Sequence, residues 1–157
     1  MAAWIVIYLQ KAPELLTAQT ICKNIESADW WTLGEDFGLE ENAVNDFMET
    51  IQWSNEPLSF GQEGQRPVQF HLWTERERIL EEIWELPAST PPLIQQHLEH
   101  IQAIVALEIR ISQLRTMFEV VAFESAYWLA ETYVGIIQAD DGQWYDYDEH
   151  RWQPISS

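Results

Sequence analysis

The spacing of apolar residues changes character along the C-terminal third of the chain. Apolar and polar residues alternate within Ala103–Ile111, and a period of two predicts a strand. Ser112–Val134 instead repeats apolar residues every three or four positions, which predicts a helix. Ile136–Tyr147 contains Asp141-Gly142 between two β-prone runs, a pair typical of a two-residue hairpin turn. Strand, helix and returning strand together predict a right-handed β-α-β unit.

The ends of these elements also follow from the sequence. Gly135 is expected to take the left-handed conformation that ends the helix. If Asp141-Gly142 forms the turn, Ala139 faces Trp144 across the hairpin. A single long helix from residue 92 to residue 134 is the alternative, and the strict alternation at Leu107–Ile111 argues against it.

The predicted helix is apolar on two sides. Val120, Phe123 and Tyr127 lie opposite the stripe that is expected to face the core. Either another helix of the chain covers this second side, or the side is a surface that binds a partner.

The N-terminal half gives weaker signals. Trp4–Leu9 is a continuous apolar run, typical of a strand buried on both faces. Pro13 is expected in the first turn of the next helix, whose stripe includes Leu15 and Cys22. Trp30-Trp31 is interpreted as part of a short strand, and a helix follows Leu39.

The middle of the chain alternates between β-prone and helical patterns. A short strand at Leu58–Phe60 is expected to pair with Val68–Trp73. Thr74 and Glu77 have the spacing of a capping box at the start of a helix. A proline-rich link at residues 87–92 is interpreted as a hinge or corner before a further helix.

Length and pattern define the expected architecture. The chain has 157 residues, so residues 1–157 are expected to form one α+β domain. We predict a single-domain sandwich of a small mixed or antiparallel sheet with helices packed on it, of ferredoxin-like character.

The charge narrows the choice of partners. The chain has 26 acidic and 8 basic residues, a formal net charge of -18. Such a surface repels phosphate backbones, which disfavours nucleic acids and anionic membranes. It favours solubility, or a basic protein that the acidic surface attracts. Cys22 is the single cysteine, so no internal disulfide forms, which fits a cytoplasmic location.

Two groups of residues resemble metal ligands without completing a site. His97 and His100 lie three positions apart on a predicted helix, but the spacing of four with an intervening glutamate is missing. Asp140-Asp141-Gly142 lacks the alternating oxygen ligands of a calcium loop. No phosphate-binding glycine loop or nucleophile elbow occurs either. We therefore predict no metal, no cofactor and no catalytic residue.

The nine tryptophans suggest a second type of site. Trp4, Trp84 and Trp128 fall in patterns expected to face the core. Exposed tryptophans beside carboxylates are typical of sugar-binding clefts, and paired carboxylates hydrolyse glycosidic bonds. The tryptophans that remain as ligand-binding candidates are Trp30, Trp31, Trp53, Trp73 and Trp144.

The sequence thus favours a small acidic protein-interaction module, non-enzymatic, cytoplasmic and of bacterial type. It would bind a basic protein, as an inhibitor or immunity-type binder does, or a second copy of itself, through Val120, Phe123 and Tyr127. The alternative is a carbohydrate- or small-ligand-binding protein, or a hydrolase, with a cleft lined by tryptophans and carboxylates.

Overall fold

One antiparallel sheet runs through the whole chain in the computed structural model, which describes residues 2–148 and 151–155. The strand order is β2-β3-β4-β5-β1-β6-β7-β8, and every neighbouring pair is antiparallel. The strands are β1 (Ala2–Leu9), β2 (Gln52–Asn55), β3 (Leu58–Gly61), β4 (Val68–Trp73), β5 (Ala103–Arg110), β6 (Gly135–Gln138), β7 (Trp144–Asp148) and β8 (Arg151–Pro154).

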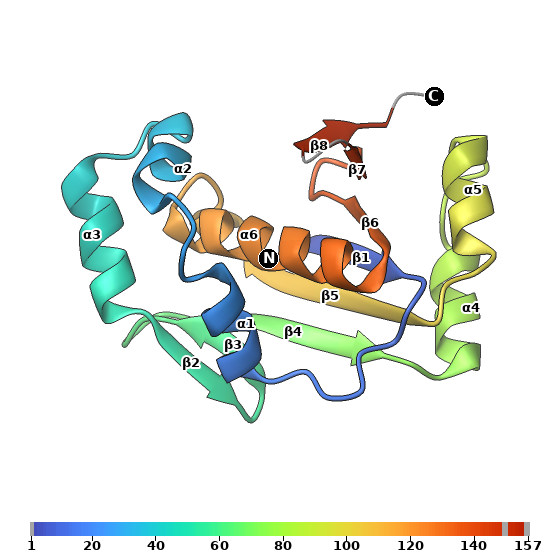
Figure 1. The fold of residues 1–157 in the computed structure, drawn as a ribbon, viewed down its shortest axis with the longest axis horizontal. Coiled ribbons are helices and arrows are strands. Elements are labelled where there is room, and N and C mark those ends of the chain that lie inside the picture. Colours follow the sequence, from blue (N-terminus) through green and yellow to red (C-terminus); the bar gives the residue numbers. More distant parts are fainter. Residues whose placement is uncertain (1, 149–150, 156–157) are drawn as a thin grey trace.

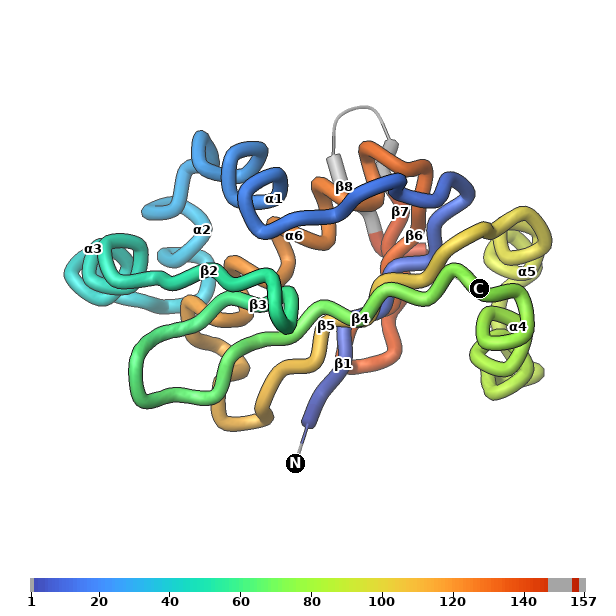
Figure 2. Tube along the Cα trace, turned by 90° about the horizontal axis from the view of Figure 1, so that it is seen from below, coloured from blue at the N-terminus to red at the C-terminus, as the bar shows by residue number. Residues whose placement is uncertain are grey.

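Helices cover the sheet unequally. Figure 1 shows α6 lying across β1 and β5, with α1–α3 towards one end of the molecule and α4–α5 at the other. Figure 2 shows α4 and α5 side by side, well away from α1–α3. No helix in the described part of the chain is long and apolar enough to cross a membrane. The helices are α1 (Ala18–Ile25), α2 (Trp30–Asp36), α3 (Glu41–Thr50), α4 (Arg76–Trp84), α5 (Pro92–Leu98) and α6 (Met117–Tyr133).

The predicted α+β class is confirmed. The strand expected at residues 103–111 is β5, so the alternative of one long helix through this region is wrong. β5 and β6 are both antiparallel to β1, which lies between them. They therefore run in the same direction, connected by α6, with one strand inserted between them.

β1 separates two hydrophobic cores. Its odd-numbered residues Ile5, Ile7 and Leu9 are fully buried in the larger core, with α1, α3 and α6. Tyr8 points the other way, into a smaller core that includes residues of α4 and α5. A strand alternates its side chains between two faces, so the continuous apolar run of β1 is explained by apolar layers on both sides.

Both ends of α6 differ from the prediction. The helix begins at Met117 rather than Ser112, because the Thr116 hydroxyl accepts a hydrogen bond from the Phe118 backbone N–H and caps it. Val134, not Gly135, takes the left-handed conformation at its end, with φ 55°. Gly135 instead begins β6.

The hairpin after β6 has a three-residue loop rather than the predicted two-residue turn. The Ala139 backbone N–H donates to the carbonyl of Gln143, and Gly142 takes a φ of +84°. Gln138 therefore faces Trp144, one position away from the predicted register. A three-residue loop with a left-handed glycine is the next most common hairpin connection.

Several local predictions in the first half are wrong. α1 begins at Ala18, after a Thr17 cap, so Pro13 lies in the preceding irregular segment. Leu15, which was expected in the stripe of this helix, lies in the same irregular segment and is 76% exposed, whereas Ile21 of α1 is fully buried. Trp30-Trp31 begins helix α2 rather than a strand.

The middle of the chain contains one confirmed pairing and several errors. β3 pairs with β4 as expected, but β2 was not predicted. No side-chain hydrogen bond caps α4, so the capping box expected at Thr74 is absent from this described helix start. Trp84, expected in the core, is 81% exposed, and Trp4 is 40% exposed.

The junction of α6 and β6 gives a stability prediction. Val134→Gly should raise the free energy of unfolding by about 1 kcal/mol, because a left-handed conformation is unfavourable for a β-branched residue. Gly135→Ala should lower it by roughly 1–3 kcal/mol, because the new Cβ would lie 2.6 Å from Leu9 Cδ2 and 3.1 Å from Ala130 Cα. Urea denaturation of both variants checks the two signs, and a stabilising Gly135→Ala would contradict this account.

Candidate functional site: an acidic cleft beside α6

A cleft of about 630 Å³ lies between α2, the first half of α6 and the hairpin formed by β6 and β7. Its volume is within the range of pockets that bind small molecules or single side chains of a partner. The lining residues are Leu33, Asp36, Phe37, Leu114, Arg115, Glu119, Val120, Phe123, Glu124, Tyr127, Ala139, Asp140, Asp141 and Tyr145.

The apolar lining comes from the second side of α6. Val120 is buried, and the half-buried rings of Phe123 and Tyr127 lie with centroids 5.7 Å apart. Phe37 from α2 and Tyr145 from β7 add to this lining from two other elements. The structure therefore brings all three of the partner-binding residues predicted from the sequence into one concave surface.

Carboxylates outnumber cationic groups in the cleft. Five acidic side chains line it: Asp36, Glu119, Glu124, Asp140 and Asp141. Arg115 is the single basic residue in the described lining, and its guanidinium lies 5.8 Å from the centre of the Phe37 ring. The cleft therefore carries a negative potential around an aromatic surface.

The hairpin loop places two of these carboxylates. Gly142 closes the three-residue loop, so Asp140 and Asp141 lie at its exposed tip. Asp141 Oδ1 accepts a hydrogen bond from the Gln143 backbone N–H at 2.9 Å, which fixes the Asp141 side chain. The loop conformation thus holds both acids at the edge of the cleft opposite α2.

Burial disfavours the ionised form of the acids on α6. Burial, and then the nearby Asp140, raise the pKa of Glu119, although a hydrogen bond from the Arg115 backbone opposes the shift. Burial also raises the pKa of Glu124. Burial, and then Glu124, raise the pKa of Tyr127 to about 12. Negative charge in this cleft is therefore costly until a cation lies beside it.

The tryptophans proposed as ligand-binding residues lie apart from one another. Trp30 packs against the larger core, whereas Trp73 packs against the smaller core on the opposite face of the sheet. Trp144 is 7% exposed and its ring contacts that of Tyr8. Trp31 is 40% exposed on α2. None of the described cleft-lining residues is a tryptophan.

The two histidines considered as metal ligands have other environments. His97 Nε2 lies 2.9 Å from the carbonyl oxygen of Tyr8, and its Nδ1 lies 3.2 Å from Gln10 Nε2. A neutral ring that donates from Nε2 and accepts at Nδ1 satisfies both contacts, and burial lowers the pKa of His97. His100 is exposed. Within the ranges that the structure describes, no group of three or more His, Cys, Asp or Glu side chains is placed to hold a metal ion.

Sequence reasoning missed the contribution of α2. Leu33, Asp36 and Phe37 reach the cleft because this segment is helical, and it was predicted as a strand and loop. The signal for the acids on α6 was present: Glu119 directly precedes Val120, and Glu124 directly follows Phe123. Residues adjacent to an apolar stripe on a helix lie along its border.

No protein-family model, curated protein or solved structure matches this chain.

The buried acid on α6 gives a prediction about pH. Because the pKa of Glu119 is raised in the folded state, its ionisation destabilises the fold as the pH rises above its ordinary value of 4.5. Glu119→Gln keeps the hydrogen-bond acceptor without the charge, so it should raise the free energy of unfolding at about pH 7 and change it little at about pH 4. Urea denaturation at both pH values measures the difference. Glu131→Gln, an exposed change on the same helix, is the control, and an equal gain there would contradict the prediction.

Proposed function

We propose that this protein is an interaction module that binds a basic segment of a partner protein in the acidic cleft. The observation that carries the proposal is the set of five carboxylates surrounding the aromatic lining from Phe123 and Tyr127. The proposed interaction is that of a lysine or arginine side chain whose apolar stem packs on the rings while its charged end meets the acids.

The energetics of the cleft support a cationic occupant. An ammonium or guanidinium group near Glu119 and Glu124 would favour their ionised forms, which burial disfavours. A cation placed over an aromatic face contributes roughly 0.5–2 kcal/mol more. The net charge of -18 also raises the rate at which a basic partner arrives. All three effects favour binding only when the ligand is positively charged.

The charge argues against a second copy of the chain as the occupant. A two-fold symmetric contact through the cleft would place the same patch on both sides of the interface. Each subunit would then bring its five carboxylates against those of the other. Like charges across an interface cost several kcal/mol, so among the partners expected from the sequence we favour the basic protein, bound in the manner of an inhibitor or immunity-type protein.

We also propose that the chain forms a single domain, a sandwich of ferredoxin-like character. The continuous sheet supports one domain, because β1 contributes to both hydrophobic cores. The loop at Pro87–Pro91 connects α4 with α5 on the same side of the sheet, as a corner within the domain rather than a boundary between two. The two parallel strands joined by α6 support the ferredoxin-like part of the proposal.

A designed peptide tests the cleft directly. A short peptide of alternating lysine and leucine should bind the protein in calorimetry at low salt. The double variant Asp140→Asn/Asp141→Asn keeps the oxygen that accepts the hydrogen bond in the loop but removes two charges. It should weaken binding by about three- to tenfold, since exposed charge pairs contribute up to about 1 kcal/mol each. The matched control is Glu49→Gln/Glu63→Gln, two exposed acids that do not line the cleft.

The aromatic lining has its own variant. Phe123→Ala should weaken binding of the same peptide, and the loss relative to the wild type should be larger at high salt. Salt screens the charges there, so apolar contacts make the main contribution to binding. Circular dichroism confirms that this variant is folded. If the control pair weakens binding as much as the loop pair, the peptide binds the acidic surface in general and the cleft proposal fails.

A further inference from the structure

A second pocket lies on the sheet where β4 and β5 separate. The last residues paired between these strands at this end are Gln69 and Glu108. Pro67 precedes β4 and has no backbone N–H to donate to the ladder, so regular pairing does not continue past it. Beyond this point a pocket of about 180 Å³ opens, lined by Ala2, Arg66, Pro67, Glu108, Ile109 and Arg110.

One buried side chain fixes the two sides of this opening. The Gln113 side chain donates from Nε2 to the carbonyl oxygen of Arg66 at 2.7 Å. Its Oε1 accepts from the backbone N–H of Arg110 at 3.0 Å. Gln113 is only 5% exposed. The glutamine amide thus replaces the missing strand pairing and holds the backbones of the two arginines in a fixed relation.

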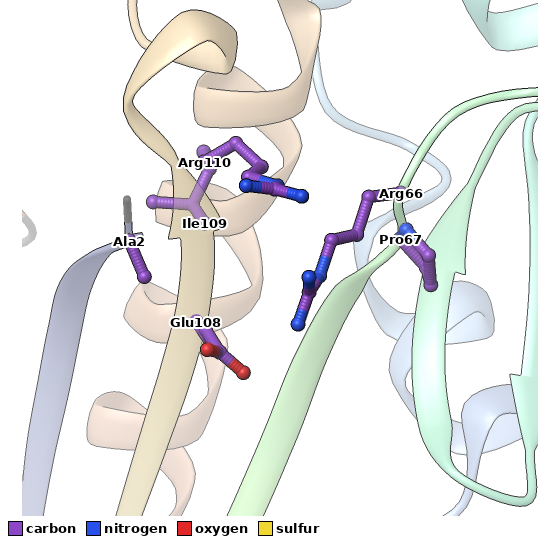
Figure 3. Close-up of a pocket in the computed structure, with 6 residues that line it drawn as sticks. All are labelled: Ala2, Arg66, Pro67, Glu108, Ile109 and Arg110. Atoms are coloured by element: carbon purple, nitrogen blue, oxygen red, sulfur yellow. The ribbon is translucent and has the colours of Figure 1, made fainter.

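Both arginine side chains extend into the pocket. Figure 3 shows the guanidinium groups of Arg66 and Arg110 approaching the same space from opposite sides, with the Glu108 carboxylate nearby. Neither guanidinium forms an ion pair with any carboxylate whose side chain the structure describes. The Glu108 carboxylate lies 3.4 Å from Nε2 of His71 instead.

The two guanidinium groups without acidic partners share this one pocket. Among the arginines whose side chains the structure describes, only Arg78 forms ion pairs, with Glu81 and Glu82. Placing two like charges in one pocket costs energy unless an anion lies between them.

We propose that Arg66 and Arg110 form a binding site for the phosphate group of a small phosphorylated ligand. A phosphate monoester carries a charge of about −1.5 to −2 at neutral pH, which matches two guanidinium groups. The planar fork of each arginine donates two parallel hydrogen bonds to phosphate oxygens. A single carboxylate would leave one guanidinium unpaired.

The size of the pocket limits what enters it. At about 180 Å³ it is smaller than the roughly 300–1,000 Å³ of sites that enclose a whole small molecule. A phosphate group therefore fits while the remainder of its ligand lies outside, on the uncovered face of the sheet. The Glu108 carboxylate repels the same phosphate and so weakens its binding. Removing the charge of Glu108 should therefore strengthen binding, whereas removing either arginine should weaken it.

Titration of the protein with inorganic phosphate at constant ionic strength tests the site. Calorimetry measures the binding, and NMR detects the arginine Nε–Hε signals. Phosphate should bind saturably and shift the signals of Arg66 and Arg110. Arg66→Gln and Arg110→Gln should each weaken binding about tenfold, as loss of a charged hydrogen-bond pair does. Glu108→Gln should strengthen it. Lys23→Gln, an exposed charge removed from α1, is the control and should change nothing.

Two results would overturn the proposal. One is the absence of saturable phosphate binding by the folded wild-type protein. The other is acetate binding as tightly as phosphate, which would make the pocket a carboxylate site. Circular dichroism of each variant separates loss of the site from loss of the fold. Because the pocket is distinct from the cleft beside α6, phosphate binding by the wild type and peptide binding by the cleft succeed or fail independently.

Discussion

The burial of β1 on both faces is the constraint on which the rest of the structure depends. Ile7 and Leu9 are fully buried on one side, and Tyr8 is 3% exposed on the other. A strand without a solvent-facing side requires an apolar layer above and below it. The chain supplies α6 with α1–α3 on one face and α4–α5 on part of the other. Where the second layer ends, Trp4 is left 40% exposed.

The cleft follows from the composition of α6. This helix is apolar around most of its circumference, and ten of its residues are buried. One side packs on β1, β5 and β6, and the helices α1, α2 and α3 contact others. The side with Phe123 and Tyr127 is only half covered, and carboxylates on α6 and on the adjacent hairpin border it. In the proposed complex, a bound cation would offset the energy lost by burying acids there, and a cost in stability of this kind is common at binding sites.

How far the sequence predicts this structure depends on the range of the forces involved. The β5-α6-β6 unit was correct in order because long apolar periods dominate local preferences, although the helix begins at Met117 rather than at Ser112. The clustering of Val120, Phe123 and Tyr127 was predicted for the same reason, since it follows from helical spacing. Errors of one residue at Val134 and in the β6–β7 register arose because several turn conformations suit the same residues. The arginine pocket was not predicted, since it depends on the place where two strands, distant in sequence, stop pairing.

The two proposed sites show that net charge does not determine local potential. Residues of opposite faces of the sheet line them: α6 and Tyr145 form the cleft, whereas Glu108 and Arg110 extend from the face opposite α6. At physiological ionic strength, charges separated by more than about 8 Å are largely screened in solvent. An acidic surplus spread over the molecule therefore does not cancel the charge of the two guanidinium groups in the pocket formed by Arg66 and Arg110. In the proposed interactions, the excess of acid would raise the rate of encounter with a basic partner, whereas the side chains within each pocket would determine which ligand stays bound.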